Sequence, residues 1–244
     1  MFSPITYDNL RLFAFSNDRQ IQGEIRGIVI HFTGMGCDER FDGTLPEGDF
    51  FAGRNIVYLI PYGNPWAWMN RQESALADEV IDVLCAHYNL PEDLPIVSTG
   101  LSMGGQGALT YMVYAKRTPA ACVANCPVCD MPFHYTERPD LPSSFYSAYL
   151  YEEGTMDEIL PRFSPLHLAE AGKMPDAAYT VFHCTKDKSV NKELHSDRFV
   201  AAMEKAGHPV TYRIVPDREH CDLPPEEREA LLEACAEGIE KTYR

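Results

Sequence analysis

The stretch that decides the fold reads Pro95-Ile96-Val97-Ser98-Thr99-Gly100-Leu101-Ser102-Met103-Gly104-Gly105-Gln106-Gly107-Ala108. A short apolar strand meets a Gly-x-Ser-x-Gly turn, and the apolar run that continues to position 115 predicts a helix directly after it. Gly100 and Gly104 flank the serine because a Cβ at either position would collide with a neighbouring strand or helix, and Gly105 and Gly107 let the helix lie close to the sheet. The pattern predicts a nucleophile elbow with Ser102 at a strained backbone angle; a loop serine that caps a helix is the alternative.

The rest of the chain alternates between strands and helices. Residues 4–32 indicate β structure, and further buried strands are predicted at 55–60, 95–101, 121–127, 178–183 and 210–215. Helical spacing is found at 76–84, 199–206 and after Pro225. This order favours the α/β class, with a mostly parallel twisted sheet covered by helices on both faces, in a single domain over residues 1–244. Residues 130–164 break the pattern, apart from one short helix at 155–160, and suggest a lid insert after the sixth strand.

The charge of the chain restricts its partners. Thirty-six acidic residues against 21 Lys and Arg give the 244-residue chain a net charge of −15. Such a surface repels phosphate backbones and anionic lipids, so we expect no nucleic-acid and no membrane partner. The N-terminal stretch Met1–Thr6 lacks the basic and apolar regions of a signal peptide, and a cytoplasmic location is expected.

The eight cysteines do not resemble a disulfide framework. Several lie in apolar segments, which is typical of free buried thiols in a reducing compartment. Cys122, Cys126 and Cys129 are closely spaced, but no matching Cys/His pair nearby completes a four-ligand zinc site. No H-E-x-x-H spacing is present either, so neither a metal nor a cofactor is expected.

A serine hydroxyl needs a base within hydrogen-bond reach and a third group that orients the base. In a parallel sheet such groups gather on the loops after the strands. Asp187 follows the strand at 178–183, and His220 follows the strand at 210–215. Asp130 is an alternative acid, whereas Asp217 and Asp222 are interpreted as solvated loop charges because they lie too close to His220 in sequence.

The chain resembles the α/β-hydrolase superfamily, and within it the catalytic domain of prolyl-oligopeptidase-like and esterase-type serine hydrolases. The resemblance covers nearly the whole chain and rests on the order Ser102, Asp187, His220 together with Ser164-Pro165-Leu166, Asp187-x-x-Val190 and Glu204-Lys205-Ala206-Gly207-His208-Pro209-Val210. Two positions depart from the pattern: members often have His-Gly where this chain has His31-Phe32-Thr33-Gly34, and Gly where Cys184 stands.

The resemblance implies a role for each residue. Ser102 attacks an acyl carbonyl, His220 takes and returns its proton, and Asp187 holds the imidazole tautomer. The backbone N–H of Met103 and a second N–H from the turn Thr33–Gly34–Met35 form the oxyanion hole. Loss of one such donor typically costs about 3 kcal/mol of transition-state stabilisation.

The remaining histidines and aromatic residues have weaker assignments. His31 and His183 end buried strands and are expected to be packed, whereas His87, His195 and His208 are expected at the surface. Cys221, beside His220, is expected to be structural. The substrate-binding candidates are aromatic residues and one histidine from the 62–68 loop and the insert, and the alternative is that they pack the lid onto the core: Trp66, Trp68, His134 and Tyr146.

The function that follows is cytoplasmic ester hydrolysis through an acyl-enzyme intermediate, on a small acyl ester or a short peptide. An ester is favoured because the chain has no room for the propeller that screens peptides in prolyl-oligopeptidase relatives, and no basic cluster for anionic substrates. A small serine peptidase is the alternative within the same class. A non-catalytic binding protein with this fold is the alternative of another class, and homo-oligomer formation is left open.

Overall fold

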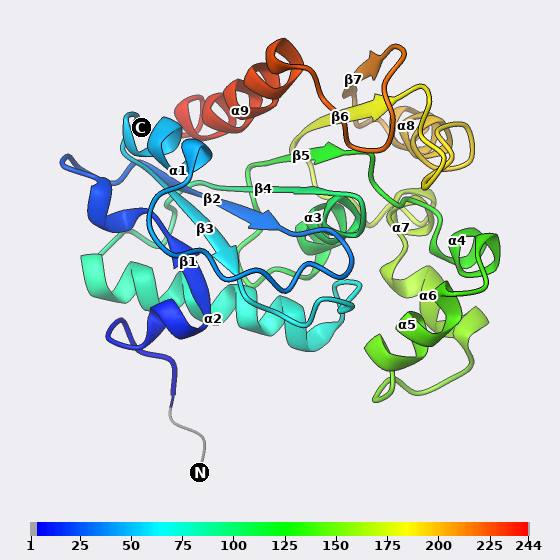
Figure 1. Cartoon of the computed structure of the whole chain (residues 1–244), viewed down its shortest axis with the longest axis horizontal. Coiled ribbons are helices and arrows are strands. Elements are labelled where there is room, and N and C mark those ends of the chain that lie inside the picture. The colour runs from blue at the N-terminus through cyan, green and yellow to red at the C-terminus, as the bar shows by residue number, and fades with distance from the viewer. Residues whose placement is uncertain (1–3, 244) are drawn as a thin grey trace.

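The computed structural model describes residues 4–243 and centres on a seven-stranded sheet (Figure 1). Residues 1–3, part of the stretch examined for a signal peptide, lie outside the described residues. The spatial order is β1-β3-β2-β4-β5-β6-β7, and only the β1–β3 pair is antiparallel. The strands are β1 Ala14–Ser16, β2 Gly27–Phe32, β3 Ile56–Pro61, β4 Ile96–Leu101, β5 Ala121–Asn125, β6 Ala178–Cys184 and β7 Val210–Val215. The central strands are buried on both faces, as expected for a parallel sheet, and the α/β prediction is confirmed.

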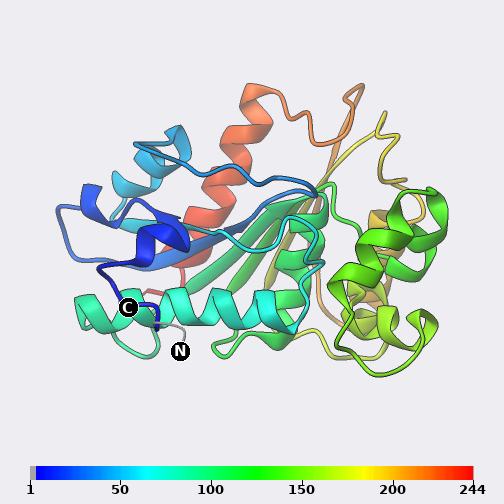
Figure 2. The same cartoon turned by 60° about the horizontal axis from the view of Figure 1, so that its bottom comes forward.

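Helices cover both faces of the sheet (Figure 2). One face carries α1 (Pro46–Ala52), which packs against β3, and α9 (Pro225–Glu240), which packs against β2, β4 and β5. The opposite face carries α2 (Arg71–Tyr88), α3 (Met103–Tyr114) and α8 (Ser196–Lys205). Helix α2 begins where the Asn70 side chain accepts a hydrogen bond from the N–H of Glu73, and ends at Asn89 in the left-handed conformation. Within residues 4–243, no helix is both long and apolar enough to cross a membrane.

The insert is helical, which corrects the expectation of an irregular segment. It contains α4 (Met131–Glu137), α5 (Leu141–Ala148) and α6 (Met156–Phe163), and α7 (Pro165–Glu170) follows it. Prolines cause the discrepancy: those at 132, 142 and 165 lie in the first turn of a helix, where the missing N–H costs nothing. Figures 1 and 2 show these helices beyond the carboxyl ends of the central strands.

The insert also follows the fifth strand, not the sixth. Of the β structure predicted over residues 4–32, the first part supplies only the short strand β1, because Leu10–Leu12 forms a 3₁₀ turn. The insert has an apolar cluster of its own, which reaches back to Trp68, to Met103 at the elbow and to Val190 in the loop after β6. The insert therefore packs directly against the end of the sheet where the predicted site residues lie.

Candidate active site

Ser102 lies at the sharp turn between β4 and α3. Its backbone angles are φ 57° and ψ −120°, a region that costs a non-glycine residue of the order of 1–3 kcal/mol. The turn is held by hydrogen bonds from Ser102 N to the Asn125 carbonyl (2.9 Å) and from Gln106 N to the Ser102 carbonyl (3.0 Å). The strained backbone angle predicted for the elbow is therefore present.

Close backbone contacts explain the flanking glycines. A Cβ built on Gly104 would lie 2.0 Å from the Phe32 carbonyl oxygen, and one on Gly100 would lie 2.3 Å from the Gly104 carbonyl oxygen. Both obstacles are backbone atoms, which cannot move without displacing β2 or α3. The steric reason predicted for these two glycines is confirmed.

Asp187 and His220 are hydrogen-bonded to each other. Oδ2 of Asp187 accepts from Nδ1 of His220 at 2.6 Å, and Oδ1 accepts from the N–H groups of Ser189 (2.8 Å) and Val190 (2.9 Å). Nε2 of His183 lies 3.4 Å from the same Oδ2. Burial alone would raise the pKa of Asp187, but the hydrogen bonds from these groups outweigh burial and hold the pKa well below its usual value. The carboxylate is therefore ionised and fixed in position.

The bond to Asp187 sets the tautomer of His220. A carboxylate only accepts, so Nδ1 carries a proton, and in the neutral ring Nε2 is the nitrogen with the lone pair. Burial lowers the pKa of His220, but the hydrogen bond to Asp187, a contact with Cys126 and the Asp187 charge raise it to about 9. An environment that favours the charged ring also stabilises the imidazolium formed when the ring accepts a proton.

Asn125, the last residue of β5, connects the elbow to the His220 loop. Its carbonyl accepts from Ser102 N, and its side-chain Nδ2 donates to the Cys221 carbonyl at 3.3 Å. Among residues 4–243 no hydrogen bond joins the Ser102 hydroxyl to His220. The imidazole Nε2 instead lies 3.6 Å from Sγ of Cys221. The elbow and the acid–histidine pair thus share one anchor, and a hydroxyl–imidazole bond often tightens only when substrate binds.

The rival carboxylates have other partners. Asp130 accepts from the Arg198 guanidinium and from the N–H of Phe133, which places it at the start of α4. Asp217 pairs with Lys186, and Asp222 pairs with Arg218, both at exposed positions. Of the four candidate acids, Asp187 is the one that is hydrogen-bonded to His220.

Two backbone segments near Ser102 offer N–H groups. Met103 is the first residue of α3, so its N–H has no acceptor within the helix. A Cβ built on Gly34 would lie 3.9 Å from Cβ of Ser102, so the turn after β2 passes beside the serine. In the described part of the chain, the N–H of Gly34 reaches no protein acceptor. Both segments therefore lie beside Ser102 and are the ones predicted to supply the oxyanion hole.

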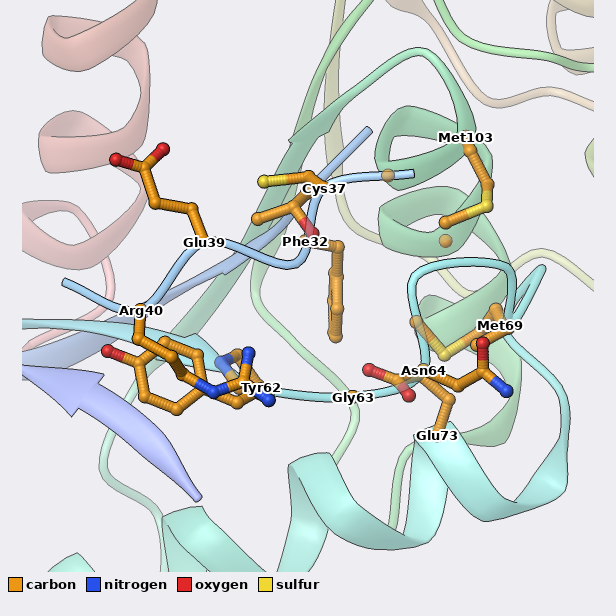
Figure 3. Close-up of a pocket in the computed structure, with 15 residues that line it drawn as sticks. Phe32, Cys37, Glu39, Arg40, Tyr62, Gly63, Asn64, Met69, Glu73 and Met103 are labelled. Atoms are coloured by element: carbon orange, nitrogen blue, oxygen red, sulfur yellow. The ribbon is translucent and has the colours of Figure 1, made fainter. Parts of the chain in front are cut away.

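Beside these segments lies a narrow pocket that includes a partly buried carboxyl group (Figure 3). Phe32, Thr33, Met103 and Gly104 are among the residues that line it. Glu73 reaches from α2 toward the loop at 63–64, where Gly63 leaves room for it, and burial raises its pKa to about 7. Sequence analysis missed Glu73, because a glutamate in the first turn of a helix carries no signal of burial.

The four substrate-binding candidates fall into two pairs. Trp68 and His134 are 1% and 3% exposed, and Trp68 donates to Ser144 Oγ and stacks on Phe145. These two residues pack the insert onto the core, as the alternative interpretation expects. Trp66 and Tyr146 are 46% and 57% exposed and stay candidates.

His195 is buried rather than exposed, which corrects the prediction of a surface position. Its Nδ1 accepts from the N–H groups of Cys129 (3.2 Å) and Asp130 (3.1 Å), and its Nε2 donates to Glu137 at 3.1 Å. His134 contacts the same carboxylate. A residue directly before a helix looks exposed in sequence, and only the packing of α4 over this loop buries it.

Comparisons with known proteins agree with this geometry. The fold is similar to an acylaminoacyl peptidase in complex with Z-Gly-Gly-Phe-chloromethyl ketone (TM-score 0.71, 14% identity, 90% of this chain and 37% of that one). It is also similar to the esterase Est2 from Thermogutta terrifontis (TM-score 0.64, 18% identity, 93% of this chain and 86% of that one). A third similar structure is an S-formylglutathione hydrolase from Agrobacterium tumefaciens (TM-score 0.68, 13% identity, 95% of each chain). At these identities the likeness concerns the fold.

Comparison of the sequence with protein families identifies the family of the chain. No curated protein matches the chain in sequence. The profile described as Prolyl oligopeptidase family matches residues 79–237, which include Ser102, Asp187 and His220. The chain spans 37% of the length of the acylaminoacyl peptidase. Since the matched segment is more than half of the sequence, the chain belongs to the prolyl oligopeptidase family.

Proposed function

We propose that the protein is a serine hydrolase that cleaves a carboxylic ester through an acyl-enzyme intermediate. The observation that carries this proposal is the Asp187–His220 pair, which leaves Nε2 to exchange the proton and is anchored through Asn125 to the strained turn at Ser102. Family membership independently supports the serine-hydrolase part of the proposal, without choosing between ester and peptide.

The proposed reaction has two halves. Ser102 Oγ attacks the acyl carbonyl while His220 Nε2 accepts its proton, and the N–H groups of Met103 and Gly34 stabilise the oxyanion. The imidazolium then gives the proton to the leaving alcohol, and the acyl group stays on the serine. Water repeats the sequence to release the acid. Asp187 keeps the proton on Nδ1 throughout, so that Nε2 is the nitrogen that exchanges protons.

A short peptide is the alternative substrate, and the family assignment favours it. Hydrolysis of p-nitrophenyl acetate and butyrate, measured beside aminoacyl p-nitroanilides, separates the two. We expect higher kcat/KM values for the esters; faster turnover of the anilides would reassign the protein as a peptidase. The exposed Trp66 and Tyr146 are proposed to contact either substrate.

We also propose that residues 1–244 act as one domain in the cytoplasm. All eight cysteines are free, and five of them are buried, which is typical of a reducing compartment. Small acyl esters are the proposed partners; homo-oligomer formation stays open.

A fluorophosphonate probe tests the chemistry directly. Wild type should be labelled on Ser102, and Ser102→Ala should lose the label and at least about 10⁴-fold in kcat. Ser143→Ala, at an exposed position in α5, is the matched control and should label like wild type. An unlabelled wild type would instead favour a non-catalytic binding protein, and a label that survives in Ser102→Ala would place the nucleophile elsewhere.

A further inference from the structure

Two thiols that are far apart in sequence flank the free nitrogen of His220. Cys126 follows β5, and Cys221 follows His220 in the loop after β7. The two sulfur atoms and the ring nitrogen lie within 4.8 Å of one another. We propose that this trio binds a thiophilic divalent cation of the Zn²⁺ class, and that the bound ion switches the enzyme off.

The spacing suits such an ion. Zinc bonds of about 2.3 Å to sulfur and about 2.0 Å to nitrogen place tetrahedral ligand atoms roughly 3.5–3.8 Å apart. His220 Nε2 and Cys221 Sγ are already 3.6 Å apart. Three protein ligands leave the fourth position for water or a substrate oxygen.

Hydrogen bonding distinguishes this trio from two other clusters of potential ligands in the described residues. In the first of these, His183 donates from Nε2 to the Val190 carbonyl at 3.1 Å and accepts at Nδ1 from the Ser196 hydroxyl at 2.6 Å. Neither nitrogen of that ring is free to coordinate a cation.

The second cluster joins His134, Glu137 and His195. His195 Nδ1 already accepts from two backbone N–H groups, so Nε2 must carry the proton that it donates to Glu137. His220 differs from both of these rings because its Nε2 lone pair faces sulfur atoms.

The surroundings of the trio also fit a metal site. Asp187 accepts from the far nitrogen of His220, which is the carboxylate–histidine arrangement that orients metal-bound imidazoles. The N–H of Cys184 donates to Cys126 Sγ at 3.4 Å, which holds this sulfur in position. Cys126 is buried, whereas Cys221 and His220 are partly exposed, so an ion has a route of entry.

Inhibition follows from the shared nitrogen. An ion on Nε2 occupies the lone pair that would accept the serine proton, so metal binding and proton transfer exclude each other. This consequence rests on the proposed function, whereas binding itself does not. The two are therefore measured separately.

Binding is tested on the full chain, reduced with a phosphine and titrated with Co²⁺ under nitrogen. We expect a sulfur-to-cobalt charge-transfer absorption that saturates at one ion per chain and is displaced by Zn²⁺. Cys126→Ser and Cys221→Ser should abolish this absorption. Cys85→Ser, which removes a partly exposed thiol on α2, should keep it. Absorption that persists in both site variants, or is missing in wild type, would overturn the proposal.

A second measurement needs no variant and guards against misfolding. Zn²⁺ should slow alkylation of Cys221 in the native wild type at least about tenfold, as followed by peptide mass spectrometry, and leave Cys85 unaffected. Equal rates with and without Zn²⁺ would also refute the site.

Inhibition is then measured as the ratio of ester hydrolysis with Zn²⁺ to hydrolysis with a chelator. Each site variant should need at least about tenfold more Zn²⁺ than wild type for half inhibition. Binding without inhibition would keep the metal site and reject the role of His220 as base.

Discussion

The elbow and the loops that carry Asp187 and His220 reach the same end of the sheet but are held there by different forces. The elbow is fixed by backbone contacts within a continuous stretch, where Gly104 faces the Phe32 carbonyl. The two loops are fixed by side chains: Asp187 is bonded to His220 and lies beside His183, and the Asn125 side chain donates to the Cys221 carbonyl.

The difference shows how each region responds to change. The elbow contains no ionisable side chain from Gly100 to Gly104, so its geometry depends on the volume of the side chains at these positions. The loops depend on charge and on the direction of hydrogen bonds. Changes of volume should therefore break the elbow, and changes of charge should break the loops.

The largest effect is expected from Asp187→Asn. The amide cannot hold the Nδ1 proton of His220 as the carboxylate does, so kcat should fall about 10⁴-fold while the fold persists. Steady-state ester hydrolysis and circular dichroism measure the two outcomes.

Asp130→Asn is the matched control for the acid. Because Asp130 pairs with Arg198, its replacement should lower kcat by less than about tenfold. Equal losses in the two variants would mean that the acid is wrongly assigned.

Gly104→Ala should have the next largest effect, on stability. The added Cβ would meet a backbone oxygen at 2.0 Å, so the free energy of unfolding should fall by at least about 3 kcal/mol. Gly107→Ala lies in the same helix, but its added Cβ would meet the flexible end of Met69 at 3.0 Å and Phe32 at an ordinary contact distance of 3.6 Å, so it should stay within about 1 kcal/mol of wild type. Urea unfolding compares them, and similar losses would remove the steric account of the elbow.

The smallest effect is expected on the stability of the fold at low pH. It concerns Glu137 in α4, which contacts His195 at the end of the loop that carries Asp187. Burial would raise the pKa of Glu137, but hydrogen bonds from His134 and His195 lower it to about 2 from 4.5. A lowered pKa stabilises the fold above about pH 4.5, and this stabilisation is lost as the pH falls toward about 2.

Urea midpoints between about pH 6 and about pH 3 measure the loss. They should fall more steeply in wild type than in Glu137→Gln, whose amide does not titrate. Equal slopes would show that Glu137 does not contribute to the pH dependence.

Local sequence patterns predicted the helices and strands whose formation depends mainly on neighbouring residues. Helix α9 begins at Pro225 as expected, and the strands around Val97 and Val181 are where apolar runs indicated them. The prediction of an irregular insert was wrong because of its prolines. A proline in the first turn of a short helix cannot be told in sequence from a proline in a loop. His195 was misplaced because its burial depends on α4, which is distant in sequence.

The sequence by itself determined the elbow, because its shape results from glycines and a serine within five consecutive residues. It also determined the order of serine, acid and histidine along the chain. Only the tertiary structure decided which carboxylate meets His220, that Trp68 and His134 are buried, and that Cys126 lies beside Cys221. Such pairings depend on how β5, β6 and β7 align, and strand alignment is a property of the whole sheet.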